Sequence, residues 1–507
     1  MKVHHGVQKP SEFVCRTGLK LAIGVVLGIV AGCSVGPDYH QPAALKSQPL
    51  PAAFSDSSPT NNAGEWKVAR PSANLPRGTW WKIFNDPELD RLEALAAAEN
   101  QDLAAAVARL DEAKAELGVA RSAFYPQVAT TPNFVRQRAS FNAPANGLSQ
   151  SKTFTYNTFN VPLDLNWELD LWGRVRRQVE SAHASFVASA DDLESARLLL
   201  QAEVASDYFS TRELDEERRV VADTIETFKR SLELTQNRRK GGIVSDLDVS
   251  QAETQLRSTE AELPAIDLQR ADTLHALAVL CGQPATGFQL ASGPLTNVIP
   301  RVPVSLPSEL LERRPDIASA ERRMAAANAQ VGVAVSAFYP QVFLAGTAGF
   351  QSVGVDTLFD WPSRMWSFGP SVTMPIFTGG QNRAELALAK ASFQETVANY
   401  RQTVLSAFQD VEDQLAAQRL LATQLEAQSA AFAAARHTLE IANNRYKAGV
   451  VTYLEVATAQ SAELDNERSF VQLEGQQLTA QVALIKALGG GWENNPADPQ
   501  PLAAKSP

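Results

Sequence analysis

The chain lacks most of the signatures by which enzymes and metalloproteins are recognised. Its 507 residues include three cysteines, and Cys15 and Cys33 belong to an N-terminal targeting region. Only Cys281 lies beyond that region, so we expect no intrachain disulfide and a buried thiol in an apolar helical setting. No P-loop, CxxC or HExxH sequence occurs, and the six histidines are scattered. We therefore expect no enzyme, no catalytic residue, no metal site and no cofactor.

Long apolar runs and an excess of positive charge are also missing. Beyond residue 33, no window contains 18 consecutive apolar residues, so any crossing of a membrane would have to use β-strands. The formal net charge of −10 argues against a nucleic-acid partner. These absences exclude helical membrane spans and nucleic-acid binding.

The N-terminal segment has the pattern of a secretory signal. Positively charged residues precede a short apolar stretch at residues 21–30, and the sequence VAGC follows at residues 30–33. This order resembles a bacterial lipobox, which implies cleavage before Cys33 and acylation of that residue. The alternative is an ordinary signal peptide with an incidental cysteine. Ser34 follows the cysteine, and in lipoproteins a residue other than Asp there implies export to the outer membrane of a Gram-negative envelope.

Two segments of the chain occur twice in the same order. SAFYPQV is found at residues 122–128 and again at 336–342, an offset of 214 residues (336 minus 122). NRRKGG at residues 237–242 is echoed by NRYKAG at 444–449, an offset of 207 residues (444 minus 237). The similar offsets indicate an internal duplication into two domain-sized halves.

Each half has the pattern of a helix, two strands, a long helix and a return helix. In the first half we expect helix 87–123, strands 128 to about 140 and 159–171, and helices 178–238 and 247–281. In the second half we expect strands 342–351 and 368–376 and helices 383–447 and 454–488. A helix of sixty residues is about 90 Å long, and such helices form coiled coils or tubes. Four long strands beside this much helix need other subunits to remove their edges.

Five further segments, by their order and spacing, resemble TolC-like outer membrane factors of the lipoprotein, resistance-nodulation-division (NodT-type) branch. They are CSVGPDY at residues 33–39, WWKIFNDP at 80–87, RRPDI at 313–317, PIFTGG at 375–380 and ALGGGW at 487–492. With this resemblance, we divide the chain into a signal peptide (1–32), a lipid-anchored N-terminal segment (33–79), outer membrane efflux repeats 1 (80–290) and 2 (291–492), and a flexible C-terminal tail (493–507).

The resemblance implies a mixed α and β membrane protein. Three copies would form a twelve-stranded outer-membrane β-barrel, with four strands per chain, continuous with a twelve-helix periplasmic α-barrel. The protein would be lipid-anchored and barrel-spanning in the Gram-negative outer membrane, with a long periplasmic extension. Its implied partners are two further copies, outer membrane lipid, a periplasmic membrane-fusion adaptor and an inner-membrane pump of the resistance-nodulation-division type.

The function implied is that of the exit duct of a tripartite efflux pump, which passively conducts drugs or other small molecules from periplasm to exterior. Two alternatives stay open. One is the duct of a metal-ion or protein (type I) exporter, although four methionines give no methionine-rich feature. The other is a non-conducting structural lipoprotein of the envelope. The alternating strand at 159–171 and the glycine-containing turns favour a duct.

By the same resemblance, the turns at residues 241–249 and 449–456 form a periplasmic gate that closes by packing inward. Leu454 aligns with an apolar constriction ring. Asp248 aligns with an acid that ties neighbouring helices together. Its expected partners on the companion coil are Arg445, Tyr446 or Lys447.

Further acids have two interpretations each. Glu455 aligns with a gate aspartate, whereas the position of a second gate acid holds Thr458. Asp248 and Glu455 could instead be ordinary acids at helix N-termini, which the helix dipole favours. On the alternating strand we expect the acids to face the lumen, with a merely solvated surface as the alternative. These acids are Asp164, Glu168 and Asp170.

Overall fold

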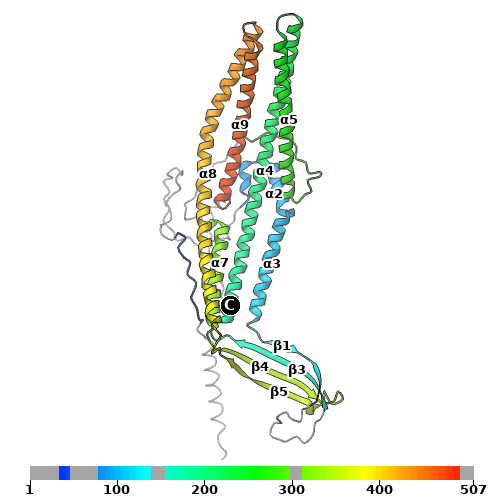
Figure 1. The fold of residues 1–507 in the computed structure, drawn as a ribbon, viewed down its shortest axis with the longest axis vertical. Helices are drawn as coiled ribbons and strands as arrows, with labels where there is room; N and C mark the ends of the chain where they lie inside the picture. The colour runs from blue at the N-terminus through cyan, green and yellow to red at the C-terminus, as the bar shows by residue number, and fades with distance from the viewer. Residues whose placement is uncertain (1–33, 46–77, 139–154, 297–310, 491–507) are drawn as a thin grey trace, which may run out of the picture. The chain divides into compact units, whose positions relative to one another are not determined.

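The computed structural model describes residues 34–45, 78–138, 155–296 and 311–490 (Figure 1). Cys33, the expected signal peptide and the expected C-terminal tail lie outside these residues. In the first half the elements are η1 (Trp80–Phe84), α2 (Pro87–Glu99), α3 (Gln101–Ser122), β1 (Gln127–Thr130), β2 (Asn133–Arg138), β3 (Thr155–Leu169), α4 (Arg174–Lys240) and α5 (Asp246–Leu280). In the second half they are α7 (Pro315–Ser336), β4 (Gln341–Ser352), η2 (Trp361–Ser363), β5 (Arg364–Thr373), α8 (Gln381–Lys447) and α9 (Tyr453–Ala487).

The described residues fall into two compact units, and each unit takes residues from both halves of the sequence. The sheet unit contains residues 111–138, 155–187 and 322–398, and all the described strands lie within these ranges. The coil unit contains residues 188–296 and 399–490, with the helices that pack on them. No helix among the described residues has a stretch both long and apolar enough to cross a bilayer.

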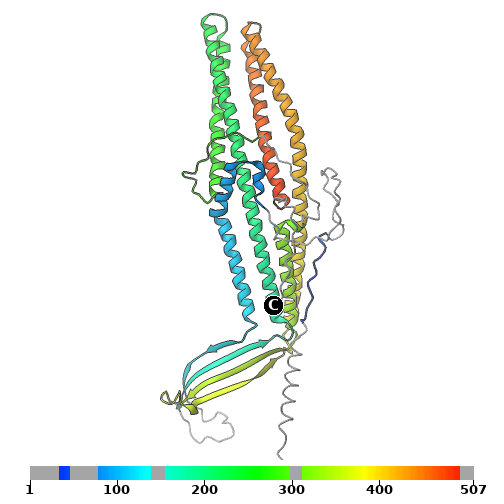
Figure 2. The ribbon, with the colours of Figure 1, turned by 180° about the vertical axis from the view of Figure 1, so that it is seen from behind.

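The sheet unit holds one antiparallel sheet with the strand order β1-β3-β4-β5, while β2 also pairs with β3 (Figure 2). The central pair places Leu165 opposite Gly346. The prediction of four long strands is therefore correct for three of them. The first expected strand is divided into β1 and β2 at residues 131–132, because Pro132 has no N–H with which to continue the ladder.

In the coil unit, two long helices each turn back into a shorter one (Figure 1). We call the α4–α5 hairpin coil 1 and the α8–α9 hairpin coil 2. The helices α4 and α8 have 67 residues each, and α5 and α9 have 35 each, so the duplication preserved both lengths. At 1.5 Å per residue the long helices measure about 100 Å. The predicted long and return helices are confirmed to within a few residues at each end.

The predicted helix at 87–123 is wrong at one position, because it is interrupted at Asn100. This residue has an extended backbone, with ψ 127°. Its side chain accepts a hydrogen bond from the Leu103 N–H (2.8 Å) and donates one to the Leu280 carbonyl (2.9 Å). Asn100 therefore begins α3 as an N-cap and also binds the end of α5.

An apolar core joins α2, α4, α5 and α9 within the coil unit. Leu89, Leu92, Tyr208 and Leu277 are among its fully buried members. The expected burial of Cys281 is confirmed.

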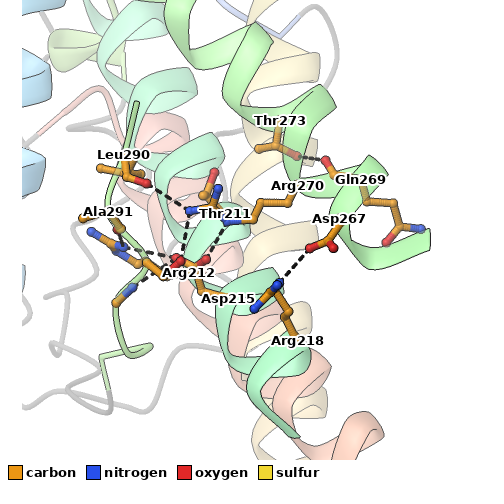
Figure 3. A network of polar contacts seen from close by, with 12 residues as sticks. Thr211, Arg212, Asp215, Arg218, Asp267, Gln269, Arg270, Thr273, Leu290 and Ala291 are labelled. Carbon is orange, nitrogen blue, oxygen red and sulfur yellow. Dashed lines mark hydrogen bonds and ion pairs between the residues drawn. The ribbon is translucent and has the colours of Figure 1, made fainter. Parts of the chain in front are cut away.

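A polar network fastens the loop after α5 to α4 (Figure 3). The Asp215 carboxylate, with 2% of its side chain exposed, accepts hydrogen bonds from Arg270 Nε (2.6 Å) and Arg212 Nη1 (3.2 Å). The same two arginines donate to loop carbonyls: Arg212 to Ala291 (2.6 Å) and Arg270 to Leu290 (3.0 Å). One buried carboxylate thus orients both guanidinium groups that hold the loop.

We expect Asp215→Ala to destabilise the coil unit by about 3–5 kcal/mol, because it leaves buried guanidinium groups unpaired. The matched control is Asp267→Ala, which removes the half-exposed ion pair with Arg218 (2.7 Å) in the same region and should cost at most about 1 kcal/mol. Thermal unfolding of the purified protein measures both. Equal losses of stability in the two variants would contradict the central role of Asp215.

Candidate functional site

The predicted gate residues lie at the tips of the two coils, where each long helix turns back. The offset of 207 residues between the repeats pairs Arg238 with Arg445 and Asp248 with Glu455. The tips can therefore be compared position by position. Their sequences are related, but their contacts differ.

The tip of coil 1 is held by polar contacts. Ser245 is the N-cap of α5, and its hydroxyl accepts a hydrogen bond from the Asp248 N–H (3.3 Å). In return, Asp248 Oδ2 accepts a hydrogen bond from the Ser245 N–H (2.9 Å), which completes a capping box. Arg239 and Asp246 form a two-pronged ion pair across the turn (2.6 and 2.8 Å). A capping box and an ion pair thus stabilise the turn of coil 1.

The tip of coil 2 is held by aromatic packing at the equivalent positions. Tyr446 and Tyr453 replace Arg239 and Asp246, and their rings pack edge to face with 5.6 Å between centroids. Both rings belong to a small apolar cluster that also contains Ala252 of coil 1. Burial, followed by the neighbouring Tyr446, raises the pKa of Tyr453 to about 12, so the ring stays neutral at physiological pH.

Among the contacts that cross from coil 1 to coil 2, those of Asp248 and Arg238 end on helix termini. Asp248 Oδ1 accepts a hydrogen bond from the Tyr453 N–H (3.3 Å), the first residue of α9. Arg238 donates to the carbonyls of Tyr446 and Lys447 (2.8 Å each), the last residues of α8, and its guanidinium lies 4.8 Å from the Tyr446 ring centroid. An anion at a helix N-terminus and a cation at a C-terminus both complement the helix dipole. We call these two contacts the cross-coil latch.

The environment of Asp248 favours its charged form. Partial burial opposes ionisation, but hydrogen bonds from the Ser245 hydroxyl and from the Ser245 and Tyr453 amides outweigh it, and the pKa of Asp248 is lowered. A carboxylate is therefore present at the latch throughout the physiological pH range.

The expected side-chain partners of Asp248 differ from those in the structure. Among the described residues, Asp248 binds Ser245 and the Tyr453 amide rather than the side chains of Arg445, Tyr446 or Lys447. The capping box engages one carboxylate oxygen and the α9 amide engages the other. Lys447 meets coil 1 through its carbonyl, and Tyr446 does so through its carbonyl and its ring.

The remaining predicted gate residues lie on coil 2. Arg445 pairs with Glu455 of its own coil (3.4 Å). Leu454 has 56% of its surface exposed in the chain, and its carbonyl accepts a hydrogen bond from Thr458 (2.8 Å). Sequence reasoning missed Arg238 and Tyr453. Alignment of the two repeats could have drawn attention to Arg238 as the counterpart of Arg445.

The three acids of the alternating strand have different partners. Asp164 accepts a hydrogen bond from the Thr347 hydroxyl of β4 (2.7 Å). Glu168 forms an ion pair with Arg174. Asp170 accepts hydrogen bonds from two backbone amides in the first turn of α4 (3.1 and 2.9 Å). Glu168 and Asp170 therefore join the end of β3 to the start of α4.

Residues 34–40, which we call the N-terminal strap, lie against α4 and α7 in the sheet unit. The Val35 N–H donates to the Trp172 carbonyl (3.0 Å), and Asp38 pairs with Arg177 (2.8 Å), whose side chain is 6% exposed. Asn328 donates to the Pro37 carbonyl (3.1 Å). The strap is thus bound through its backbone as well as through an ion pair between the exposed Asp38 and the buried Arg177.

Three glycines make close packing of the strap possible. Gly36 has φ +99°, and a Cβ there would lie 2.6 Å from Cα of Gly332 on α7. Ser34 lies on Gly173, where a Cβ would meet the Ser34 Oγ at 2.8 Å. Gly173 precedes α4, so the first described residue after Cys33 lies at the junction between strand and helix.

Most of the chain is similar to known proteins of one family. The outer membrane efflux protein family matches residues 92–283 and 306–490. The chain belongs to this family.

Three known proteins illustrate the relationship. The chain is 33% identical to the antibiotic efflux pump outer membrane protein ArpC of Pseudomonas putida over 477 residues, which cover 93% of this chain and 95% of that protein. It is 31% identical to the probable outer membrane lipoprotein SilC of Salmonella typhimurium over 479 residues, which cover 94% and 99%. The solved structure of the outer-membrane channel OprN matches with a TM-score of 0.81 and 31% identity, covering 91% of this chain and 100% of that one.

These findings confirm the predicted fold class, the outer membrane location and the assignment to efflux channels. They also confirm that this outer membrane efflux protein is not an enzyme, since the family consists of efflux proteins.

We expect Gly36→Ala to release the N-terminal strap, because the new methyl group collides with the α7 backbone and the left-handed φ is strained. Limited proteolysis within residues 34–45 should become at least several-fold faster. Gly380→Ala is the matched control, since Gly380 has φ +92° but no atom within 4 Å of a built Cβ. Equal cleavage rates in the Gly36 variant and the unmodified protein would show that the strap does not depend on this close contact.

Proposed function

We propose that this outer membrane efflux protein is the exit duct of a tripartite pump that conducts drugs or other small molecules from the periplasm to the exterior. An inner-membrane transporter of the resistance-nodulation-division type would supply the energy through a periplasmic adaptor. The relative named as an antibiotic efflux pump protein, which matches nearly the whole chain, supports this kind of cargo and assembly.

A homotrimer is supported by the edges of the sheet. Among the described strands, β5 pairs only with β4, so its other edge has free N–H and C=O groups. Exposed edges of this kind invite pairing with another chain. Trp366 and Phe368 on β5 are 81% and 65% exposed, which fits contact with lipid or with a neighbouring copy. Three such sheets would close a twelve-stranded barrel, in which Asp164, Glu168 and Asp170 would line the lumen or its rim.

We place the gate of this duct at the coil tips. Its residues would be Asp248, Arg445, Tyr446, Lys447, Leu454 and Glu455, with Arg238 added from the structure. The cross-coil latch supports this proposal, because an outward movement of coil 2 against coil 1 would have to break it. The exposed Leu454 is free to meet other copies near the trimer axis, as an apolar constriction requires.

In planar bilayers, we expect low resting conductance from the purified protein and at least about tenfold higher open probability after Arg238→Met combined with Asp248→Ala. A hydrogen bond to a charged group is worth about 1.5–3 kcal/mol, and 1.4 kcal/mol corresponds to a factor of ten. Adding Leu454→Ala should raise the conductance further and sensitise cells to vancomycin.

The matched control is Arg239→Met, which should leave conductance unchanged, because among the described residues Arg239 pairs only with Asp246 of its own coil. Unchanged conductance in a folded, trimeric double variant would show that the latch is not part of the gate. Absence of any conductance from the unmodified protein and all variants would favour the structural lipoprotein.

We further propose that Cys33 carries the lipid anchor, which the position of Ser34 at the strand–helix junction supports. Cys33→Ser should abolish metabolic labelling with palmitate and mislocalise part of the protein. Export activity should survive in part, since the membrane strands also hold the protein in the bilayer. Undiminished labelling of this variant would exclude acylation at Cys33.

A further inference from the structure

A single glycine interrupts the side-chain surface of α9 where this helix packs on α4. Gly475 is the only glycine of α9 and is buried. A Cβ at this position would lie 2.5 Å from Oε2 and 2.6 Å from Cγ of Glu213 on α4. The Glu213 side chain therefore occupies the space that any other residue at position 475 would fill. We call this arrangement the Glu213 notch.

The charges around the notch leave Glu213 without a counter-ion. Arg468 of α9 is the nearest cation on the facing helix, and it already pairs with Glu217 of α4 (2.6 Å) and Glu262 of α5 (2.8 Å). Glu474, the residue before Gly475, adds a further carboxyl to this stretch of α9. Among the described residues, no donor or cation contacts the Glu213 carboxyl group. The notch thus contains more acids than bases.

Glu213 consequently resists ionisation. Burial, followed by the negative charge of Glu217, raises the pKa of Glu213 from 4.5 to about 7. A carboxyl whose pKa is higher in the packed state stabilises that state fully below pH 4.5, and this contribution is lost as the pH rises through about 7. The group therefore titrates in the physiological range, in direct contact with the backbone of the other coil.

We propose that Glu213 and the notch at Gly475 form a pH-sensitive contact between coil 1 and coil 2. The neutral carboxyl group packs closely on α9, whereas the carboxylate moves toward water and loosens this part of the seam. Of the other charged groups of the seam, Glu217 and Glu262 pair with Arg468, which holds the helices aligned, while burial and Glu216 raise the pKa of the half-buried Glu474. The proposal concerns helix packing and stands apart from the export function.

Hydrogen exchange of the α9 segment 470–480 in the full-length trimer measures this contact. After correction for intrinsic exchange, opening of the segment should be about tenfold more favourable at pH 8 than at pH 6, as linkage predicts for a shift from 4.5 to about 7. E213Q keeps the shape of the neutral acid, so it should show the slow exchange of pH 6 at both pH values. G475A fills the notch, so it should show fast exchange at both.

The control E226Q alters a carboxyl that pairs with Lys229 (2.8 Å) on the same helix, and it should keep the full pH dependence. Retention of the pH dependence in E213Q, or equal exchange at the two pH values in the unmodified protein, would overturn the proposal. Because the readout is hydrogen exchange and not conductance, either result leaves the proposed duct function untouched.

Discussion

The helix ends at the coil tips impose the constraint on which the rest of this account depends. The last carbonyls of α8 and the first N–H groups of α9 have no partners within their own helices. Coil 1 supplies both: Arg238 donates to the carbonyls of α8, and Asp248 accepts from the first amide of α9. Each contact has the charge that the helix dipole favours at that end. The turn of coil 2 also donates to the end of α8, from Gly449 N–H to the Tyr446 carbonyl (3.0 Å), so coil 1 adds charged partners to helix ends that coil 2 caps in part by itself.

Duplication followed by divergence explains why the two coils bind each other in this way. The repeats kept identical helix lengths, yet one tip carries the Arg239–Asp246 ion pair where the other carries the Tyr446–Tyr453 ring pair. The aromatic pair of coil 2 gives the apolar surface on which the coils meet. Coil 1 provides the charged side chains whose hydrogen bonds cross to coil 2. The two repeats thus contribute different kinds of contact to the place where the tips meet.

Much of the fold could be predicted from the sequence because it rests on local patterns. Repeated segments, uninterrupted helical periodicity and the alternating strand identified both halves and most helix bounds. The break at Asn100 was missed because its reason is non-local: the side chain also binds Leu280, far along the chain. The residues predicted to form a gate lie together at the coil tips, and their role as a gate stays a prediction. Arg238 was missed, since its partners are backbone carbonyls of the other repeat. Glu168 and Asp170 follow the strand alternation, yet their contacts serve the adjoining helix α4.

The central claim is that the two coil tips of one protomer are latched together at rest and separate when the channel conducts. Spin labels on the exposed residues Ile243 and Val450, carried by one protomer per trimer, report the distance between the tips by double electron–electron resonance. The account predicts a single narrow distribution in the resting trimer and a second, longer distance when the trimer is assembled in an active pump. A distribution that stays unchanged in the conducting assembly would mean that the coils move as one body, and would contradict the latch as the gate.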